Sequence, residues 1–138
     1  MTYRGPNFVQ CDIRTLTGPM LNAAVLIARG AVFEIDNKKR RAFYCLPNGK
    51  TGALAYYQPT VDIAQALMLL GEDVCIGLDV IGTAYYMDSR GNYYEYPASN
   101  RKESLCRCFV AYKVHPSETV GIPTPLYHWI NSNDPSQV

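Results

Sequence analysis

The stretch Pro59-Thr-Val-Asp-Ile-Ala-Gln-Ala-Leu-Met-Leu-Leu-Gly71 carries the strongest local signal in the chain, because it marks both ends of a helix. Thr60 is a suitable N-cap, since its hydroxyl can accept hydrogen bonds from the free N–H groups of the first turn. Asp62 places a negative charge at the positive end of the helix dipole. A glycine, which favours the left-handed conformation common at helix C-termini, follows the last apolar residue. The apolar stripe, at spacing i, i+3, i+4 and i+7, comprises Ile63, Ala66, Leu67 and Leu70. The sequence therefore predicts a helix over residues 60–71.

Three short strand patterns follow this helix directly. They cover residues 74–79, 83–87 and 93–96, and the chain can reverse at Gly82 and in the turn 88–92. Strands joined so tightly must be antiparallel, because a parallel pair needs a long crossover connection.

Two more helices are expected on either side of this region. An apolar face at helical spacing predicts a first helix between Leu16 and Arg29. Ser99 or Asn100 caps a last long helix, which ends at His115 because a proline follows.

The remaining segments are a hairpin and a tail. Residues 31–35 and 42–46 form a β-rich pair, and the basic run Lys38–Arg41 lies at the tip between them. Four adjacent cations on a loop are either a solvated turn or a contact for an anion or a nucleic acid. Residues 116–138 are rich in proline and are predicted to be an extended tail.

The order of these elements predicts a single α+β domain over residues 1–138, built from a mainly antiparallel sheet packed with three helices. An α/β/α sandwich and a two-layer sandwich both fit this order. The predicted core includes Ile63, Leu67, Leu70, Ile76, Leu105, Phe109 and Tyr112.

The composition and net charge of the chain argue against two classes of partner, nucleic acids and membranes. The chain has 138 residues, of which 48% are hydrophobic and 18% charged, and these values are typical of a globular protein. A formal net charge of +1 argues against sequence-specific nucleic-acid binding. No apolar run is long enough to cross a bilayer, and the N-terminus lacks the apolar core of a signal peptide. The sequence therefore predicts a cytoplasmic protein without a membrane partner.

The five cysteines are expected to be reduced thiols that pack as small apolar groups. They form no C-x-x-C pair, and only two histidines accompany them, so no zinc site and no cofactor are predicted.

Three sequence blocks resemble a family of small proteins from tailed phages and prophages, whose function is uncharacterised and whose predicted fold is an α/β/α sandwich. Leu16-Thr-Gly18 followed by Leu21-x-x-Ala24-Val25 is similar to the family's opening helix, which begins with Leu-Thr-Gly. Pro59-Thr-Val-Asp62 is similar to its Pro-Ser-Thr-Asp helix start. Glu103-Ser-Leu-Cys-Arg-Cys-Phe-Val-Ala-Tyr-Lys113, then Val120-Gly-Ile-Pro123, resembles its closing Ala-Met-Arg-Cys-Tyr-Val-Ala-Ser-Lys and Val-x-Val-Pro. The resemblance implies a phage-encoded accessory protein that acts in the host cytoplasm.

No catalytic constellation is visible in the sequence, so no enzyme activity is predicted. Nucleophilic catalysis needs a base beside a serine or cysteine. His115 and His128 are the two candidates for a base, but each also suits a role on the surface or in packing.

The tyrosine pattern is the feature that stands out. Tyr56-Tyr57, Tyr85-Tyr86 and Tyr93-Tyr94 are adjacent pairs, and in a strand such neighbours point to opposite faces of the sheet. One interpretation is that antiparallel strands simply favour tyrosine. The other is that the outward rings form a stacking platform for nucleobases.

A ligand site is predicted near the start of the 60–71 helix, where free N–H groups favour an anion. Arginines are expected to hold the charge, and Asp62 is expected to cap the helix or to accept from a sugar hydroxyl. The predicted site residues are Tyr57, Thr60, Asp62, Arg90 and Arg101.

Three functions remain open at this stage. The first is a phage protein that counters host antiviral defence by sequestering a nucleotide-like signal without catalysis. The second is an inhibitor of a host defence protein complex, with tyrosines and Trp129 as interface anchors. The third is a small nucleotide hydrolase. The sequence leaves the ligand, the host target and the formation of a homo-oligomer undecided.

Overall fold

The computed structural model describes residues 7–36, 38–72 and 75–132 of the chain. These ranges contain four α-helices and eight strands, and every strand pairing in them is antiparallel. The elements are β1 (Phe8–Asp12), α1 (Gly18–Ala28), β2 (Val32–Asp36), β3 (Arg41–Cys45), β4 (Thr51–Ala53), α2 (Ile63–Glu72), β5 (Ile76–Leu78), β6 (Ala84–Met87), β7 (Tyr93–Tyr96), α3 (Arg101–Val114), β8 (Thr119–Pro123) and α4 (Thr124–Ser132). The predicted α+β class is confirmed.

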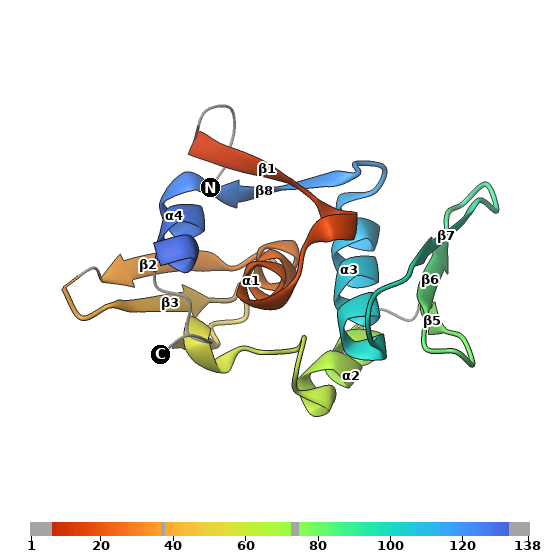
Figure 1. The fold of residues 1–138 in the computed structure, drawn as a ribbon, viewed down its shortest axis with the longest axis horizontal. Coiled ribbons are helices and arrows are strands. Elements are labelled where there is room, and N and C mark those ends of the chain that lie inside the picture. Colours follow the sequence, from red (N-terminus) through yellow and green to blue (C-terminus); the bar gives the residue numbers. More distant parts are fainter. Residues whose placement is uncertain (1–6, 37, 73–74, 133–138) are drawn as a thin grey trace.

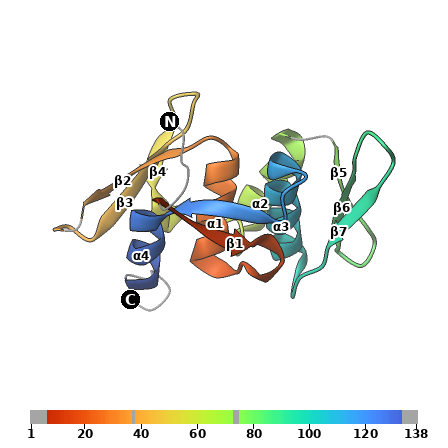
Figure 2. The ribbon, with the colours of Figure 1, turned by 90° about the horizontal axis from the view of Figure 1, so that it is seen from above.

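The strands form three small sheets, in the orders β1-β8, β2-β3-β4 and β5-β6-β7. Helices α1 and α3 pack together in the middle of the molecule, and the β1-β8 pair runs across them (Figures 1 and 2). The β2-β3 hairpin and the β5-β6-β7 sheet lie at opposite ends of the long axis (Figure 1). The single mainly antiparallel sheet expected from the sequence is therefore divided among three places around a helical centre.

Helix α2 forms where the sequence predicts it, but its cap and its buried face differ. Asp62 is the N-cap, because its Oδ1 accepts from the N–H groups of Ala64 (3.0 Å) and Gln65 (3.3 Å). Thr60 is buried instead, and its backbone N–H donates to Oδ1 of Asn22 at 3.1 Å. The helix ends at Glu72, one residue beyond the predicted glycine.

The prediction that Ile63 and Leu67 belong to the core is wrong. Ile63 is 44% exposed and Leu67 is 47% exposed, whereas Ala66 is fully buried and Leu69 is 2% exposed. Residues 66–70 are apolar without interruption, so two different helical stripes fit the sequence equally well. Packing in three dimensions selects the stripe that contains Leu69.

The other predicted core positions divide into two groups. Leu105, Phe109 and Ile76 are buried, as expected. Leu70 and Tyr112 are partly buried and pack against the core from its margin.

The prediction of an extended tail is wrong for the described residues 116–132, because β8 and α4 occupy most of them, and residues 133–138 lie outside the described ranges. Strand β8 pairs along its whole length with β1. Pro125 lies in the first turn of α4, where the missing N–H group breaks no helical hydrogen bond. Leu126, Trp129 and Ile130, at spacing i, i+3 and i+4, are the buried residues of this helix.

All five cysteines are free thiols. Cys106 and Cys108 are buried, as expected, whereas Cys75 is exposed. Burial, followed by the charge of Glu103, raises the pKa of Cys106 to about 12, so this thiol remains protonated at neutral pH.

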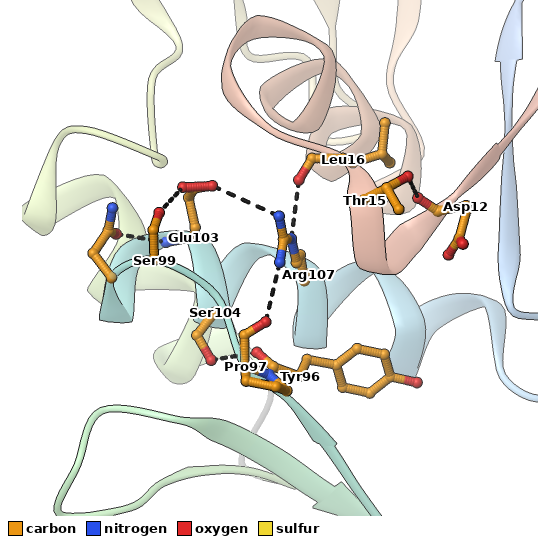
Figure 3. Close-up of polar contacts among 10 residues, drawn as sticks. Asp12, Thr15, Leu16, Tyr96, Pro97, Ser99, Glu103, Ser104 and Arg107 are labelled. Atoms are coloured by element: carbon orange, nitrogen blue, oxygen red, sulfur yellow. Dashed lines mark hydrogen bonds and ion pairs between the residues drawn. The ribbon is translucent and has the colours of Figure 1, made fainter.

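A buried polar frame joins the beginning of α3 to its neighbours (Figure 3). The Arg107 guanidinium donates from Nε to the Leu16 carbonyl (2.9 Å) and from Nη1 to the Pro97 carbonyl (3.0 Å). Its Nη2 lies 3.8 Å from Oε1 of Glu103, whose Oε2 accepts from the Ser99 hydroxyl at 2.8 Å. One side chain therefore ties α3 both to the segment before α1 and to the end of β7.

Ser104 completes this frame at the sheet. Its Oγ accepts from the Ala84 N–H at 2.7 Å and donates to the Tyr96 carbonyl at 2.6 Å. The side chain is buried, so it fixes the distance between α3 and strands β6 and β7. This attachment determines where the far end of the sheet lies relative to the end of α3.

Candidate functional site

The five predicted site residues do not converge on one site. Tyr57 and Thr60 line a small cavity, whereas Arg90 lines a larger cleft. Asp62 and Arg101 are exposed at the beginnings of α2 and α3, and neither lines either of these hollows.

The small cavity has a volume of about 260 Å³ and lies among residues of α1, the 54–61 segment and α4. This volume is slightly below the range of typical ligand pockets, about 300–1,000 Å³. The groups in its wall also have structural partners. The Tyr57 hydroxyl accepts from Nη1 of Arg29 at 3.1 Å, and Asn22 holds the backbone of Thr60.

The larger cleft has a volume of about 940 Å³ and lies between the 88–92 turn and the end of α3. Its size falls within the range of ligand pockets. Rings and cations share its wall. Its wall includes Tyr86, Asp88, Arg90, Tyr94, Lys113 and His115.

Asp88 shapes the turn that forms one side of the cleft. Its Oδ1 accepts from the backbone N–H groups of Arg90 and Asn92, each at 2.9 Å. Its Oδ2 accepts from Nδ2 of Asn92 (3.0 Å) and from the Tyr94 hydroxyl (3.3 Å). The side-chain hydrogen bond from Asn92 is the main reason that the pKa of Asp88 is lowered. The carboxylate therefore stays ionised while four donors compensate its charge.

His115 forms the opposite side and closes the end of α3. Its Nδ1 shares a hydrogen bond of 2.9 Å with the Tyr86 hydroxyl, and its Nε2 lies 4.0 Å from Oδ2 of Asp88. The imidazole also meets the rings of Tyr86 and Tyr94 edge to face, at centroid distances of 5.6 Å and 5.3 Å. Edge-to-face contacts of this kind orient rings as well as bury them.

The two tyrosines behind His115 form a stack that fills the wall of the cleft. The rings of Tyr86 and Tyr94 are 5.1 Å apart and inclined by 23°, and Tyr96 continues the stack on the other side of Tyr86 at 6.1 Å. Burial is the first cause of a raised pKa at each of these three phenols. All three hydroxyls therefore remain neutral at physiological pH.

The expected alternation of the tyrosine pairs is confirmed in β6 and β7. Tyr86 is buried and faces α3, whereas Tyr85 before it is more exposed and faces away. In β7 the inner positions are Tyr94 and Tyr96, and Tyr93 lies on the outer face with more than half of its surface exposed. Each pair thus contributes one ring to the cleft side of the sheet and one ring to the opposite side.

The hydrogen bonds of this cleft show which groups hold its histidine. No serine in the described ranges is hydrogen-bonded to His115 or His128. His128 is exposed on α4, where its ring meets the ring of Tyr127. His115 itself is positioned by a phenol on one nitrogen and a carboxylate near the other. The arrangement suits a binding site in which imidazole and phenol groups are held in place.

Sequence reasoning included Arg90 but missed the residues that accompany it in the cleft. The signal for Asp88 and Asn92 is the pattern Asp-x-x-x-Asn in a hairpin turn, which is typical of a carboxylate that accepts turn N–H groups. Tyr94 could have been placed beside this turn from the register of the hairpin, which pairs it with Tyr86. The approach of His115 depends on how α3 packs on the sheet, and no local pattern encodes it.

Neither a metal site nor a membrane span is evident in the part of the chain that the structure describes. No group of three histidine, cysteine, aspartate or glutamate side chains there could hold a metal ion. None of its helices combines the length and the apolar character needed to cross a bilayer. Comparison with protein-family models finds no match, and neither does comparison with curated proteins.

Proposed function

We propose that this protein is a non-catalytic binding protein that takes up a nucleotide-like ligand in the cleft between the 88–92 turn and the end of α3. The observation that carries the proposal is that aromatic rings and two cations, Arg90 and Lys113, line the same hollow of about 940 Å³. A nucleotide requires this combination, because its base stacks on rings and its phosphates need positive charge.

The charges in the cleft suggest how such a ligand lies. Arg90 is exposed at the tip of the turn, and its guanidinium can hold a phosphate through two parallel hydrogen bonds. Asp88 and the carbonyl end of α3 both disfavour an anion nearby. We therefore place the phosphate at the Arg90 side and the base against Tyr94 and His115.

We propose binding without catalysis because both ring nitrogens of His115 already face other side chains. A histidine that acts as a general base needs a ring nitrogen within hydrogen-bond reach of the proton that it removes. His115 already shares Nδ1 with Tyr86, and its Nε2 faces Asp88. The proposal is therefore sequestration of an intact ligand.

The biological role that we propose rests on the resemblance to phage proteins. A phage accessory protein that sequesters a nucleotide-like signal in the host cytoplasm would counter a host antiviral defence that depends on that signal. The second candidate is inhibition of a host defence complex through an interface. The exposed apolar side chains of α2 and the residues before it favour this alternative: Val61, Ile63, Leu67 and Met68.

The test is a thermal-shift screen of the full chain with cyclic and linear nucleotides, followed by calorimetry on each ligand that raises the melting temperature. A ligand that binds only the folded state at 100 times its Kd adds about 2.7 kcal/mol of stability. Recovery of the nucleotide unchanged after incubation supports sequestration, and its conversion would support the hydrolase instead.

Two arginine variants locate the site. Arg90→Ala should weaken binding at least tenfold, because it removes the phosphate contact, and should leave the melting temperature of the free protein unchanged. Arg101→Ala is the matched control, because Arg101 is also exposed but lines neither hollow. Equal loss in both variants, or a screen without any stabilising nucleotide, would make the interface the first candidate.

A further inference from the structure

The face of the β5-β6-β7 sheet that points away from α3 carries two partly exposed aromatic rings. The rings of Tyr85 and Tyr93 are 5.1 Å apart and inclined by 31°. The ring of Tyr85 lies over Gly77 on the neighbouring strand, where an added Cβ would come within 2.4 Å of the ring. The missing side chain at Gly77 thus lets the tyrosine lie flat. We call Gly77, Tyr85, Tyr93 and Glu95 the outer platform.

The outer platform carries one carboxylate, that of Glu95. Arg14 donates to the Glu95 backbone carbonyl at 2.9 Å, but its ion pair is with Glu118 and not with this carboxylate. Glu95 pairs directly with Tyr85 across the β6-β7 ladder, and its side chain is exposed without an ion pair to any described cation. The carboxylates of Glu95 and Asp79 both contribute, after burial, to the raised pKa of Tyr93, so both lie close enough to act on its ring. Aromatic faces beside carboxylates attract lysine and arginine side chains, through cation–π contacts and charge.

Two exposed apolar side chains lie in the β5-β6 turn, next to the strands of the outer platform. Val80 and Ile81 are 102% and 83% exposed, respectively. Two branched apolar residues at a turn are unusual for a surface that faces only water, because contiguous exposed apolar groups mark interaction sites. This region therefore has the composition of an interface with an acidic rim.

A surface of the opposite charge lies at the other end of the molecule. Lys38, Lys39, Arg40 and Arg41 form the tip of the β2-β3 hairpin, and all four are exposed. None of them forms an ion pair with a carboxylate in the described part of the chain. Figure 1 shows this hairpin and the β5-β6-β7 sheet projecting in opposite directions along the long axis.

We propose that two copies of this chain associate head to tail, with the basic tip of one copy docked on the outer platform of the next. Complementary charge identifies the occupant, since the same chain supplies both a cationic protrusion and an acidic aromatic surface. The contact uses two different surfaces of one chain, so it is heterologous and extends into a ring or an open chain of copies. It leaves the ligand cleft on the opposite face of the sheet accessible.

Sedimentation velocity over a range of protein concentrations tests this association in 50 mM and 500 mM NaCl. Association should be evident at low salt and weaker at high salt, because salt screens charges at the surface. Glu95→Lys and Lys39→Glu should each weaken it at least tenfold. The chain that carries both substitutions should regain at least part of the association, because the two charges are exchanged.

Two control variants exclude an effect of net charge alone. Glu34→Lys changes the charge as Glu95→Lys does, on the exposed surface of β2, and Lys50→Glu matches Lys39→Glu in the turn before β4. Both controls should associate within a factor of two of the original chain. Equal loss in controls and test variants would overturn the proposal.

A monomer at every concentration would also overturn it. In that case, an NMR titration with the peptide Gly-Arg-Gly-Arg-Gly shows whether the outer platform binds a different cationic segment. Shifts confined to Gly77, Tyr85 and Glu95 would assign this surface to another protein rather than to a second copy.

Discussion

Similar charged side chains occur in two regions along helix α3, but in one region they hold the fold together and in the other they line an open cleft. In its first half, Glu103 is buried and Arg107 is partly buried, and their polar groups bind two carbonyls and a hydroxyl and lie close to each other. At its end, Asp88, Arg90 and His115 surround an open cleft. Charge alone therefore does not identify a binding site, because the same residue types build the frame and the cleft.

The two regions differ in what their guanidinium groups bind: that of Arg107 donates to groups of the protein, and that of Arg90 faces solvent. In the frame, a single guanidinium donates to two backbone carbonyls of other segments, the partly buried one of Leu16 and the exposed one of Pro97. In the cleft, the Arg90 guanidinium is exposed, and only its backbone N–H is engaged, by Asp88. A polar cluster whose partners are all internal stabilises the fold, whereas one that faces solvent can receive a ligand.

The largest expected effect is that of Arg107→Ala. The substitution leaves the buried Glu103 carboxylate without its cation and two carbonyls without their donor. We expect a loss of about 3–5 kcal/mol in the free energy of unfolding, the usual result of breaking a buried ion pair. Urea denaturation of this variant and of Arg90→Ala measures the contrast, since the latter should lose less than about 0.5 kcal/mol. Similar losses would show that the two ends do not differ as described.

The next largest effect separates the two sides of α2, which packs against α3. Leu69→Ala removes a side chain that is 2% exposed, and should cost about 2–5 kcal/mol. Leu67→Ala, two residues earlier, should cost less than about 1 kcal/mol, because almost half of that side chain already contacts solvent. Thermal or urea unfolding of both variants tests the orientation of the helix. The reverse order would restore the stripe that the sequence alone suggested.

Ser104→Ala should produce an intermediate effect within the frame. It leaves the Ala84 N–H and the Tyr96 carbonyl without their side-chain partner, at a cost of about 1–3 kcal/mol. Ser89→Ala makes the same chemical change in the exposed 88–92 turn and should be close to neutral. If both variants were neutral in denaturation experiments, the attachment of α3 to β6 and β7 would not depend on this hydroxyl.

The smallest effect concerns Asp88 and depends on pH. Hydrogen bonds lower the pKa of Asp88 in the folded state, so its contribution to stability is complete above the unfolded value, about 3.9, and is lost as pH falls through the folded value. The original chain should therefore be more stable than Asp88→Asn at pH 6, and the difference should shrink toward pH 2. Urea unfolding at several pH values measures it. A difference that stays constant or grows in acid would contradict this sign.

Local signals in the sequence were sufficient for most of the elements before residue 116 but insufficient for the faces that these elements bury. Asn100 caps α3 as expected, since its Oδ1 accepts from the Glu103 N–H at 3.0 Å, and this interaction lies within one turn. The burial of Leu69 instead of Leu67 depends on what packs against α2, which a run of apolar residues does not encode. Helix α4 was missed because its prolines suggested an extended tail, although one of them occupies a first helical turn.

Fewer features of the candidate site than of the fold could be predicted from the sequence. The alternation of Tyr85 and Tyr86 was predictable, because a strand sends neighbouring side chains to opposite faces. The position of Tyr57 was not, since the residue lines a different hollow from Arg90 and its hydroxyl is held by Arg29. Arg90 and His115 are 25 residues apart in the chain, and only the packing of α3 on the sheet brings them to one cleft.

Because Gly77 has no side chain, a substitution at this position would change the outer face of the β5-β6-β7 sheet but not the face that points toward α3. Any larger residue there would displace the ring of Tyr85 on the outer face, because the added Cβ would overlap it. The ring of Tyr86, on the same strand, points the other way and would keep its contacts with His115. Variation at position 77 would therefore change the proposed assembly surface and leave the proposed ligand cleft unchanged.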